Sequence, residues 1–465
     1  MAGFIVSLSA IQANPQARPG WVVGILVASY LAVTIALKLF DTKLAMKRLN
    51  SSGAASGWGR VLSTMISIIA QLWIIMGPVA VLMLGFAHWV WIDLNLRSLP
   101  LIGEIATLVP FIAALIIFWT MDYPCHIASR QLAASSDIMM GRLPKRIWTF
   151  RQYLIFNIRT HLLFLAVPIG LMILLSDCIS LYLSPAVKGF FFGEYLVMGL
   201  SIAIVPLVFI LAPVLIVRIW QTRPIKTGPL KDDLDAMSKK FSLRFRQLRL
   251  WCSGGVVANA AMLGFVGKFR YILLSDAMID NMEPDQVKAV FAHEAGHIVH
   301  HHIPAMVLFL ISSMLLATAA VGFIDMVIPL DDWSQAGAVT TLLIAFFAGF
   351  FGWMSRRFER QADVLAAWAS GPEPAENENP DRISPEGAEM FATALENIAM
   401  LNNMSLHKHN WRHGAIAWRV QYIRSLAQRG GSRREINQLV KRIMLCLLAS
   451  LTAGIAMTLI LEFVL

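Results

Sequence analysis

Long apolar runs, separated by polar segments, dominate the pattern along this chain. Each run is long enough for a helix to cross the hydrocarbon core of a bilayer. We therefore predict a mainly α, polytopic membrane protein with about eight transmembrane helices, the fifth of which contains Pro206 and Pro213 and is expected to kink or break there. The runs lie near 21–40, 62–87, 101–120, 160–183, 190–219, 303–328, 337–354 and 442–464.

Composition agrees with a membrane protein. The mean hydropathy of +0.63 and the 15% share of charged residues are far outside the range of soluble globular proteins. Residues 1–20 lack the basic start of a signal peptide, so we expect the first run to remain as an anchor. The four cysteines are scattered and form no closely spaced pair, which predicts neither a disulfide framework nor a cysteine metal site.

The distribution of Lys and Arg predicts the orientation. The loops after the first and third runs, and the segments after the fifth and seventh, are rich in basic residues. The intervening loops contain Arg97 alone, Lys188 alone, and the pair Asp331-Asp332 with no base. The positive-inside rule then places the N-terminus outside and residues 221–302 in the cytoplasm, as in a bacterial inner membrane. This topology accounts for the net charge of +10, and we expect no nucleic-acid partner because no recognition motif accompanies the bases.

A small β-sheet is predicted where the chain first becomes polar, after a short helix near 231–240. Three short runs of strand-forming residues follow, at 245–251, 256–263 and 271–274. An exposed edge of such a sheet can add a peptide as an extra strand through its backbone alone. Asn259 and Ala260 lie on the best candidate for that edge, and a purely structural hairpin is the alternative.

The helix that follows the sheet contains the sequence His-Glu-Ala-Gly-His. Pro284 suits its first turn. His293 and His297 are separated by four residues and so share one helical face, where two neutral imidazoles can bind one Zn²⁺. Glu294 lies beside the first histidine, where a carboxylate can take a proton from a water molecule. The alternative is an ordinary helix whose histidines face water or the core.

A second pair of residues that could contribute to a metal site lies on a predicted helix after the seventh apolar run. Glu359 and Asp363 are again four residues apart. One carboxylate can bind a metal ion while the other accepts the ring N–H of a ligand histidine. Taken alone, the two would be a solvated charged face, but together with the histidine pair they predict a site for one Zn²⁺ per chain.

The predicted organisation has five parts. Helices and loops of the membrane domain are followed by the cytoplasmic sheet with the histidine helix, then by two membrane helices, the remainder of the polar domain and a last membrane helix. The corresponding ranges are 1–220 with five transmembrane helices, 221–302, 303–354, 355–441 with the third metal ligand, and 442–465.

Three stretches of this sequence resemble one family. HEAGH, the later SRRFERQAD and the preceding NAAMLGFVGKFRYILLSD are similar to the membrane zinc metallopeptidases that include the CAAX prenyl proteases and bacterial HtpX. The order of sheet, histidine helix, two membrane helices and second motif also matches, and the number of spans is closest to the multi-spanning CAAX prenyl protease subgroup. The eighth run, 442–464, departs from that pattern.

The resemblance implies a role for each residue in the matching motifs. It implies a gluzincin site with His293, His297 and Glu359 as zinc ligands, Glu294 as the base and Asp363 supporting a ligand. It further implies that the strand containing Asn259 and Ala260 binds substrate backbone, and that His413 and Arg419 contact the substrate or the developing oxyanion. Gly414 stands where the family usually has proline.

These observations predict an integral-membrane zinc metalloendopeptidase that hydrolyses membrane-associated, lipidated or misfolded proteins. The alternative is a metal-dependent membrane scaffold or transporter without hydrolase activity, which would make Glu294 dispensable. An intramembrane protease fits less well, because His300, His301 and His302 make the region after the motif too polar for the middle of a bilayer. The sequence names neither the physiological substrate nor the oligomeric state.

Overall fold

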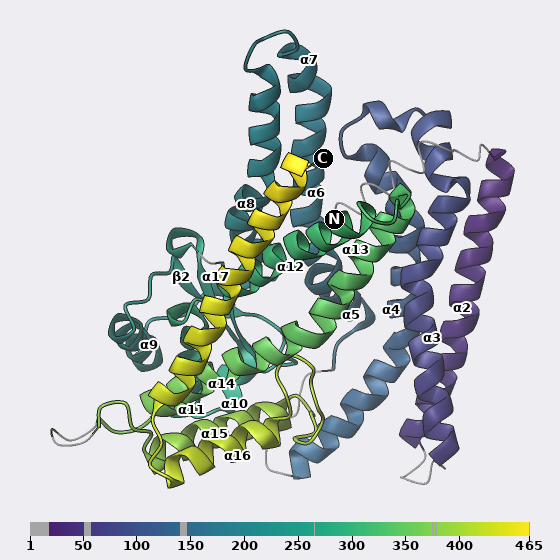
Figure 1. Cartoon of the computed structure of the whole chain (residues 1–465). Coiled ribbons are helices and arrows are strands. Elements are labelled where there is room, and N and C mark those ends of the chain that lie inside the picture. The colour runs from purple at the N-terminus through teal and green to yellow at the C-terminus, as the bar shows by residue number, and fades with distance from the viewer. Residues whose placement is uncertain are drawn as a thin grey trace. The chain divides into compact units, whose positions relative to one another are not determined.

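The computed structural model describes residues 18–50, 57–139, 147–264, 266–373, 376 and 379–464, and its chain is mainly helical (Figure 1). Eight helices of the described part are long and apolar enough to cross a membrane, which confirms the predicted fold class. Several spans are longer than the apolar runs indicate. The largest extensions are those of Phe150–Ala186, and of Asp332–Ala369, which continues through Glu359 and Asp363.

The chain divides into two compact units, Met1–Trp220 and Gln221–Leu465. In the first unit, α2 (Gly20–Asn50) packs against α3 (Gly57–Val81) and α4 (Ile102–Met139), and α6 (Phe164–Cys178) packs against α8 (Gly193–Ile219). Pro206 and Pro213 both lie inside α8, which remains one helix. The unit is completed by η1 (Leu82–Phe86), η2 (Trp89–Asp93), η3 (Leu96–Ser98), α5 (Phe150–Asn157), η4 (Ile158–Leu163), η5 (Ile179–Leu183) and α7 (Ser184–Ala186).

A four-stranded sheet begins the second unit. Its strands are β1 (Thr222–Pro224), β2 (Gln247–Trp251), β3 (Ala260–Leu263) and β4 (Tyr271–Ser275), in the spatial order β1-β2-β4-β3. The central pair β2 and β4 is parallel, and both outer pairs are antiparallel. Every residue of β4 is buried, so this strand joins the sheet to the hydrophobic core.

The strand predicted at 256–263 is shorter than expected, because only its second half pairs in the sheet. The side-chain amide of Asn402 forms two hydrogen bonds with the backbone of Ala258. It donates to the carbonyl at 2.7 Å and accepts from the N–H at 3.0 Å. The N–H of Val257 donates to Oγ of Ser253 at 3.2 Å, and the N–H of Asn259 donates to Oγ of Ser275 at 2.9 Å. Side chains therefore satisfy the backbone that would otherwise have extended the strand.

One edge of β3 carries no strand of the described chain. The N–H of Ser275 donates to the carbonyl of Asn259 at 3.0 Å, which identifies these two opposite residues as a hydrogen-bonded pair. Such pairs alternate along antiparallel strands. The backbone N–H and C=O groups of Ala260 and Met262 therefore point away from β4, towards the free edge.

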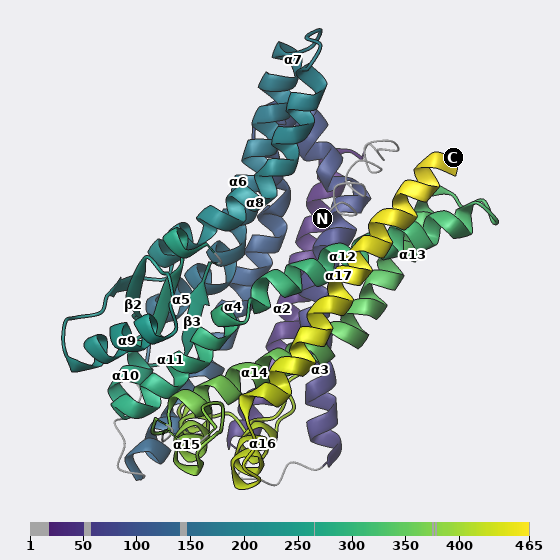
Figure 2. The same cartoon turned by 60° about the vertical axis from the view of Figure 1, so that its left-hand side comes forward.

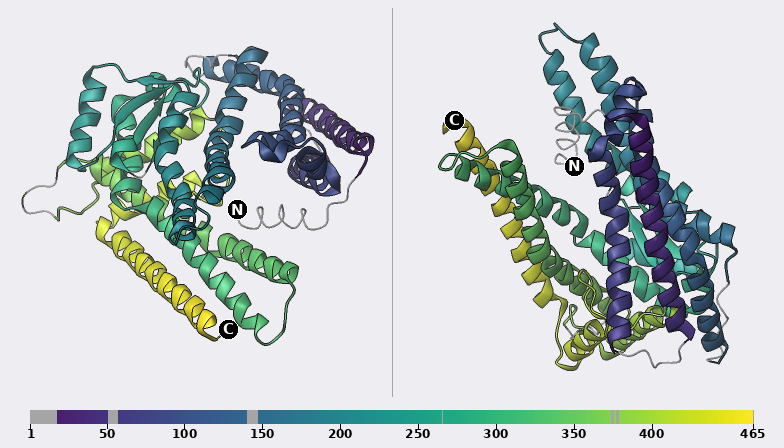
Figure 3. Two further views of the ribbon diagram at one scale, coloured as in Figure 1. Left: turned by 90° about the horizontal axis from the view of Figure 1, so that it is seen from above. Right: turned by 90° about the vertical axis from the view of Figure 1, so that its right-hand side faces the viewer.

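Helices cover the sheet and complete the unit (Figure 2). Within it, α11 packs against α14 and α15, and α17 runs beside α12, as Figures 1 and 3 show. The side chains of Phe291, Phe358 and Phe391 are fully buried in the core between these helices. The helices are α9 (Pro229–Lys240), η6 (Gly267–Phe269), α10 (Asp276–Asn281), α11 (Pro284–Val299), α12 (His302–Asp325), α13 (Asp332–Phe346), η7 (Phe347–Phe351), α14 (Gly352–Ala369), α15 (Pro385–Leu401), α16 (Ile416–Gln428) and α17 (Arg433–Val464).

Candidate metal centre and its surroundings

Close packing of α11 on α14 brings the two sequence motifs together. Pro284 occupies the first turn of α11, as predicted. Gly296 lies where the helices meet, and a Cβ atom there would come within 2.9 Å of the Cα atom of Ala362. A glycine between the two histidines thus allows α11 to approach the part of α14 that carries Glu359 and Asp363.

Three potential ligands converge at this contact. The Nε2 atoms of His293 and His297 are 3.3 Å apart. They lie 3.6 Å and 3.7 Å from the two carboxylate oxygens of Glu359. Among the residues that the structure describes, this is the only group of at least three His, Cys, Asp or Glu side chains arranged to hold a metal ion.

The protonation state of His297 and the set of donor groups suit a metal ion. Burial, assisted by the charge of His293, lowers the pKa of His297 to about 4, so its imidazole is neutral near pH 7. Burial also disfavours the charged form of His293, but the hydrogen bond and charge of Asp363 outweigh it and raise the pKa of His293. Two imidazoles and one carboxylate form a donor set typical of catalytic zinc, and the three residues therefore fit this ion.

Asp363 holds His293 and Arg419 together from the side away from the three ligand atoms. Its Oδ1 atom is 2.9 Å from Nδ1 of His293, which leaves Nε2 of that ring directed at Glu359 and His297. Arg419 donates to both oxygens of Asp363, at 2.8 Å and 2.5 Å. Burial disfavours the charge of Arg419, yet Asp363 raises its pKa above the ordinary arginine value. The structure thus places the guanidinium on Asp363, with Nη2 also 3.5 Å from Glu359.

His413 reaches the same group from a loop. Its Nδ1 atom is 2.8 Å from Oε1 of Glu359, and its side chain is 42% exposed. Asn410 shapes the loop by accepting from the backbone N–H of His413 and by exchanging backbone hydrogen bonds with Gly414. Gly414 has φ +77°, a value closed to proline, whose ring fixes φ near −65°. A proline therefore does not fit the conformation of the chain at Gly414.

Glu294 lies beside the three ligands without belonging to them. Burial raises the pKa of Glu294 to about 7, and a backbone hydrogen bond from Met262 is among the contacts that favour its charged form. Met262 belongs to the free edge of β3, so the edge strand and the candidate base are neighbours. Ala260 begins that strand, and Asn259 precedes it with an exposed side chain.

Sequence reasoning missed three polar residues that contact the site from behind. They form a hydrogen-bonded chain that starts at His297 and consists of His302, Gln361 and Asn437. The three consecutive histidines after the HEAGH motif, His300 to His302, were a usable signal. The sequence did not indicate which of them contacts His297. Met262 was also missed, because its contribution comes from the backbone.

Comparison with known proteins supports the same family. Residues 224–378 match the model of Peptidase family M48. The protease HtpX of Pseudomonas savastanoi pv. phaseolicola is 29% identical over 125 residues, which cover 24% of this chain and 42% of that protein. The HtpX of Pseudomonas putida strain GB-1 is 28% identical over the same length and with the same coverage. The chain therefore spans less than half the length of these curated relatives.

A solved structure is also similar to this chain. The crystal structure of S. mikatae Ste24p superposes with a TM-score of 0.43 at 15% sequence identity, covering 88% of this chain and all of that one. This likeness is too low to establish a shared fold by itself. The M48 match and the HtpX relatives confirm the predicted resemblance to membrane zinc metallopeptidases, and the eight apolar helices confirm a multi-pass membrane protein.

Proposed function

We propose that this chain is an integral-membrane, zinc-dependent endopeptidase that cleaves membrane-associated, lipidated or misfolded proteins. The observation that supports it best is the convergence of His293, His297 and Glu359 beside Glu294, within the region that matches the M48 family. A scaffold or transporter would need the three ligands but would have no use for a carboxylate directly beside them.

One Zn²⁺ would be held by His293, His297 and Glu359. When bound, such an ion polarises the scissile carbonyl and makes a nearby water molecule more acidic. Glu294 takes the proton from the attacking water and passes it to the leaving amine nitrogen. Asp363 and Arg419 orient His293, whereas His413, the most exposed of these groups, donates to the oxyanion that develops on the substrate.

The substrate would bind as an added strand on the free edge of β3. Backbone groups of Ala260 and Met262 point to that edge, and Asn259 precedes them with an exposed amide. Such pairing holds a peptide extended next to Glu294 without selecting its side chains. We further propose that the site faces the cytoplasm of a bacterial inner membrane, that the lipid bilayer is a partner, and that no nucleic acid is bound.

The decisive experiment uses the full chain in lipid nanodiscs and the substitution Glu294→Gln. It preserves size and hydrogen bonding but removes the base, so cleavage of an unfolded or lipidated peptide should fall by roughly 10²–10⁴-fold with zinc still bound. His413→Ala should have a smaller effect, and Cys446→Ser, an exposed and distant control, none. If Glu294→Gln cleaves at the normal rate while retaining zinc, the hydrolase mechanism is wrong and the scaffold alternative replaces it.

A further inference from the structure

Four polar side chains form a continuous chain of contacts from the candidate metal centre to the C-terminal membrane helix. Nδ1 of His297 is 2.8 Å from Nδ1 of His302, and Nε2 of His302 is 2.9 Å from Oε1 of Gln361. Nε2 of Gln361 then donates to Oδ1 of Asn437 at 2.7 Å. The four residues belong to four different helices, α11, α12, α14 and α17.

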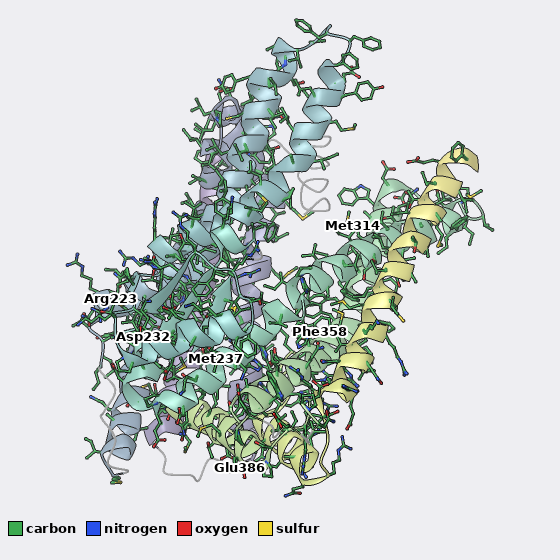
Figure 4. All side chains as sticks on the ribbon, turned by 90° about the vertical axis from the view of Figure 1, so that its left-hand side faces the viewer. Arg223, Asp232, Met237, Met314, Phe358 and Glu386 are labelled. Carbon is green, nitrogen blue, oxygen red and sulfur yellow. The ribbon has the colours of Figure 1, made fainter. Side chains whose placement is uncertain are left out.

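The two middle members of this series of side chains, His302 and Gln361, are shielded from solvent, and packing holds His302 in place. His302 has no exposed surface and Gln361 only 4%. The ring of His302 stacks on that of Phe358, with centroids 4.4 Å apart and planes 4° from parallel, and Phe358 is labelled in Figure 4. His301 precedes His302 with φ +55°, in the left-handed region, so the chain turns there between α11 and α12. This turn directs His302 back towards His297.

The direction of the hydrogen bonds determines which nitrogen of each ring carries a proton. Gln361 gives its N–H to Asn437, so its oxygen faces His302 and accepts from Nε2 of that ring. A neutral imidazole has one N–H, so Nδ1 of His302 is an acceptor. Nδ1 of His297 must then be the donor, which leaves a lone pair on its Nε2 atom. That atom faces His293 and Glu359, where a metal ion would bind.

If the hydrogen bonds ran in the opposite direction, His297 would be unable to act as a metal ligand. If the amide of Gln361 were turned over, its NH₂ group would donate to Nε2 of His302, and the proton of His302 would move to Nδ1. His297 would then carry its own proton on Nε2, and that atom would be unable to bind a cation. In the structure the amide oxygen of Asn437, and not its NH₂ group, faces Gln361, and this orientation selects the first direction.

We propose that Asn437 is a positioning residue that fixes the tautomer of His297 through Gln361 and His302. The first turns of the C-terminal membrane helix, whose presence departs from the resembled subgroup, thus belong to the metal centre. The inference rests on the proposed role of His297 as a zinc ligand, but it concerns a residue 140 positions further along the chain in a different helix. Outer partners of ligand histidines contribute strongly to metal affinity in general.

The test measures zinc affinity by chelator competition on the full chain in nanodiscs, without any activity assay. Asn437→Leu removes the acceptor and should weaken zinc binding by roughly 10–100-fold. Asn437→Asp keeps an acceptor at the same place and should bind zinc like the wild type. Gln438→Leu, the adjacent and exposed position on α17, is the matched control and should also be unchanged.

A rescue variant keeps the test informative if packing rather than hydrogen bonding is disturbed. Gln361→Glu presents an acceptor to His302 in either orientation, so adding it to Asn437→Leu should restore most of the lost affinity. Wild-type affinity in Asn437→Leu, or equal losses in Asn437→Leu and Asn437→Asp, would overturn the inference while leaving the protease proposal intact. Absence of zinc binding by the wild type would instead overturn the proposed function and the inference with it.

Discussion

Removing the guanidinium of Arg419 should destabilise the unit Gln221–Leu465 by several kcal/mol. Asp363 is 1% exposed and receives two hydrogen bonds from Arg419, at 2.8 Å and 2.5 Å. Arg419→Met retains much of the apolar stem but leaves a buried carboxylate with only His293 as its partner. Loss of one member of a buried ion pair typically costs about 3–5 kcal/mol, because the remaining charge is left unpaired.

This magnitude translates into a measurable shift in melting temperature. Folded units of 150–250 residues lose about 2–4 °C per kcal/mol, so Arg419→Met should melt roughly 6–20 °C lower. The assay follows tryptophan fluorescence of purified protein in detergent with a chelator present, which removes any contribution from bound metal. The double variant Asp363→Asn with Arg419→Met removes both charges and should recover part of the loss. A melting temperature of Arg419→Met within about 2 °C of wild type would refute this account of the pair.

Three further outcomes are expected. Purified wild type should contain about one Zn²⁺ per chain, and Glu359→Ala should lose most of it; full zinc occupancy in that variant would contradict the ligand assignment. Because burial raises the pKa of Glu294 to about 7 and the base must be ionised, kcat/KM should decline as the pH falls below that value. A bound cation lowers this pKa, so the inflexion should lie at pH 7 or below, and one above it would contradict the assignment. A reporter inserted at 41–60 should be cytoplasmic, whereas one beside Asp331 and a C-terminal tag should be external; a tag reached only from the cytoplasm would show that α17 does not cross the membrane.

The membrane helices were predictable because hydropathy is summed over many residues and needs no knowledge of contacts. The details of the sheet were less accessible. β1 has only three residues and includes Pro224, so it has no recognisable alternation. The first half of the strand predicted at 256–263 does not pair in the sheet, because Ala258 forms hydrogen bonds with Asn402 instead. Asn402 lies 144 positions further along the chain, and no local sequence pattern indicates such a distant partner.

The core of the candidate site was readable from the sequence for a similar reason. His293 and His297, like Glu359 and Asp363, are four residues apart on one helix, so helical geometry alone brings each pair together. Their surroundings depend on packing between helices. The role of Asn437 has no local signature, since it requires α17 to pass α14 at the position of Gln361.

The free edge of β3 limits how much backbone pairing alone contributes to holding the proposed substrate strand. The two N–H and two C=O groups of Ala260 and Met262 point outward. The N–H of Met262 already donates to Glu294, so three groups remain to pair with a substrate strand. At about 0.5–1.5 kcal/mol each, these three bonds supply roughly 1.5–4.5 kcal/mol, which corresponds at best to a millimolar dissociation constant. Confinement to one bilayer raises the effective concentration of a substrate into that range without any added contact. On the proposed function, sharing a membrane with the enzyme would then select substrates more strongly than the sequence around the cleaved bond.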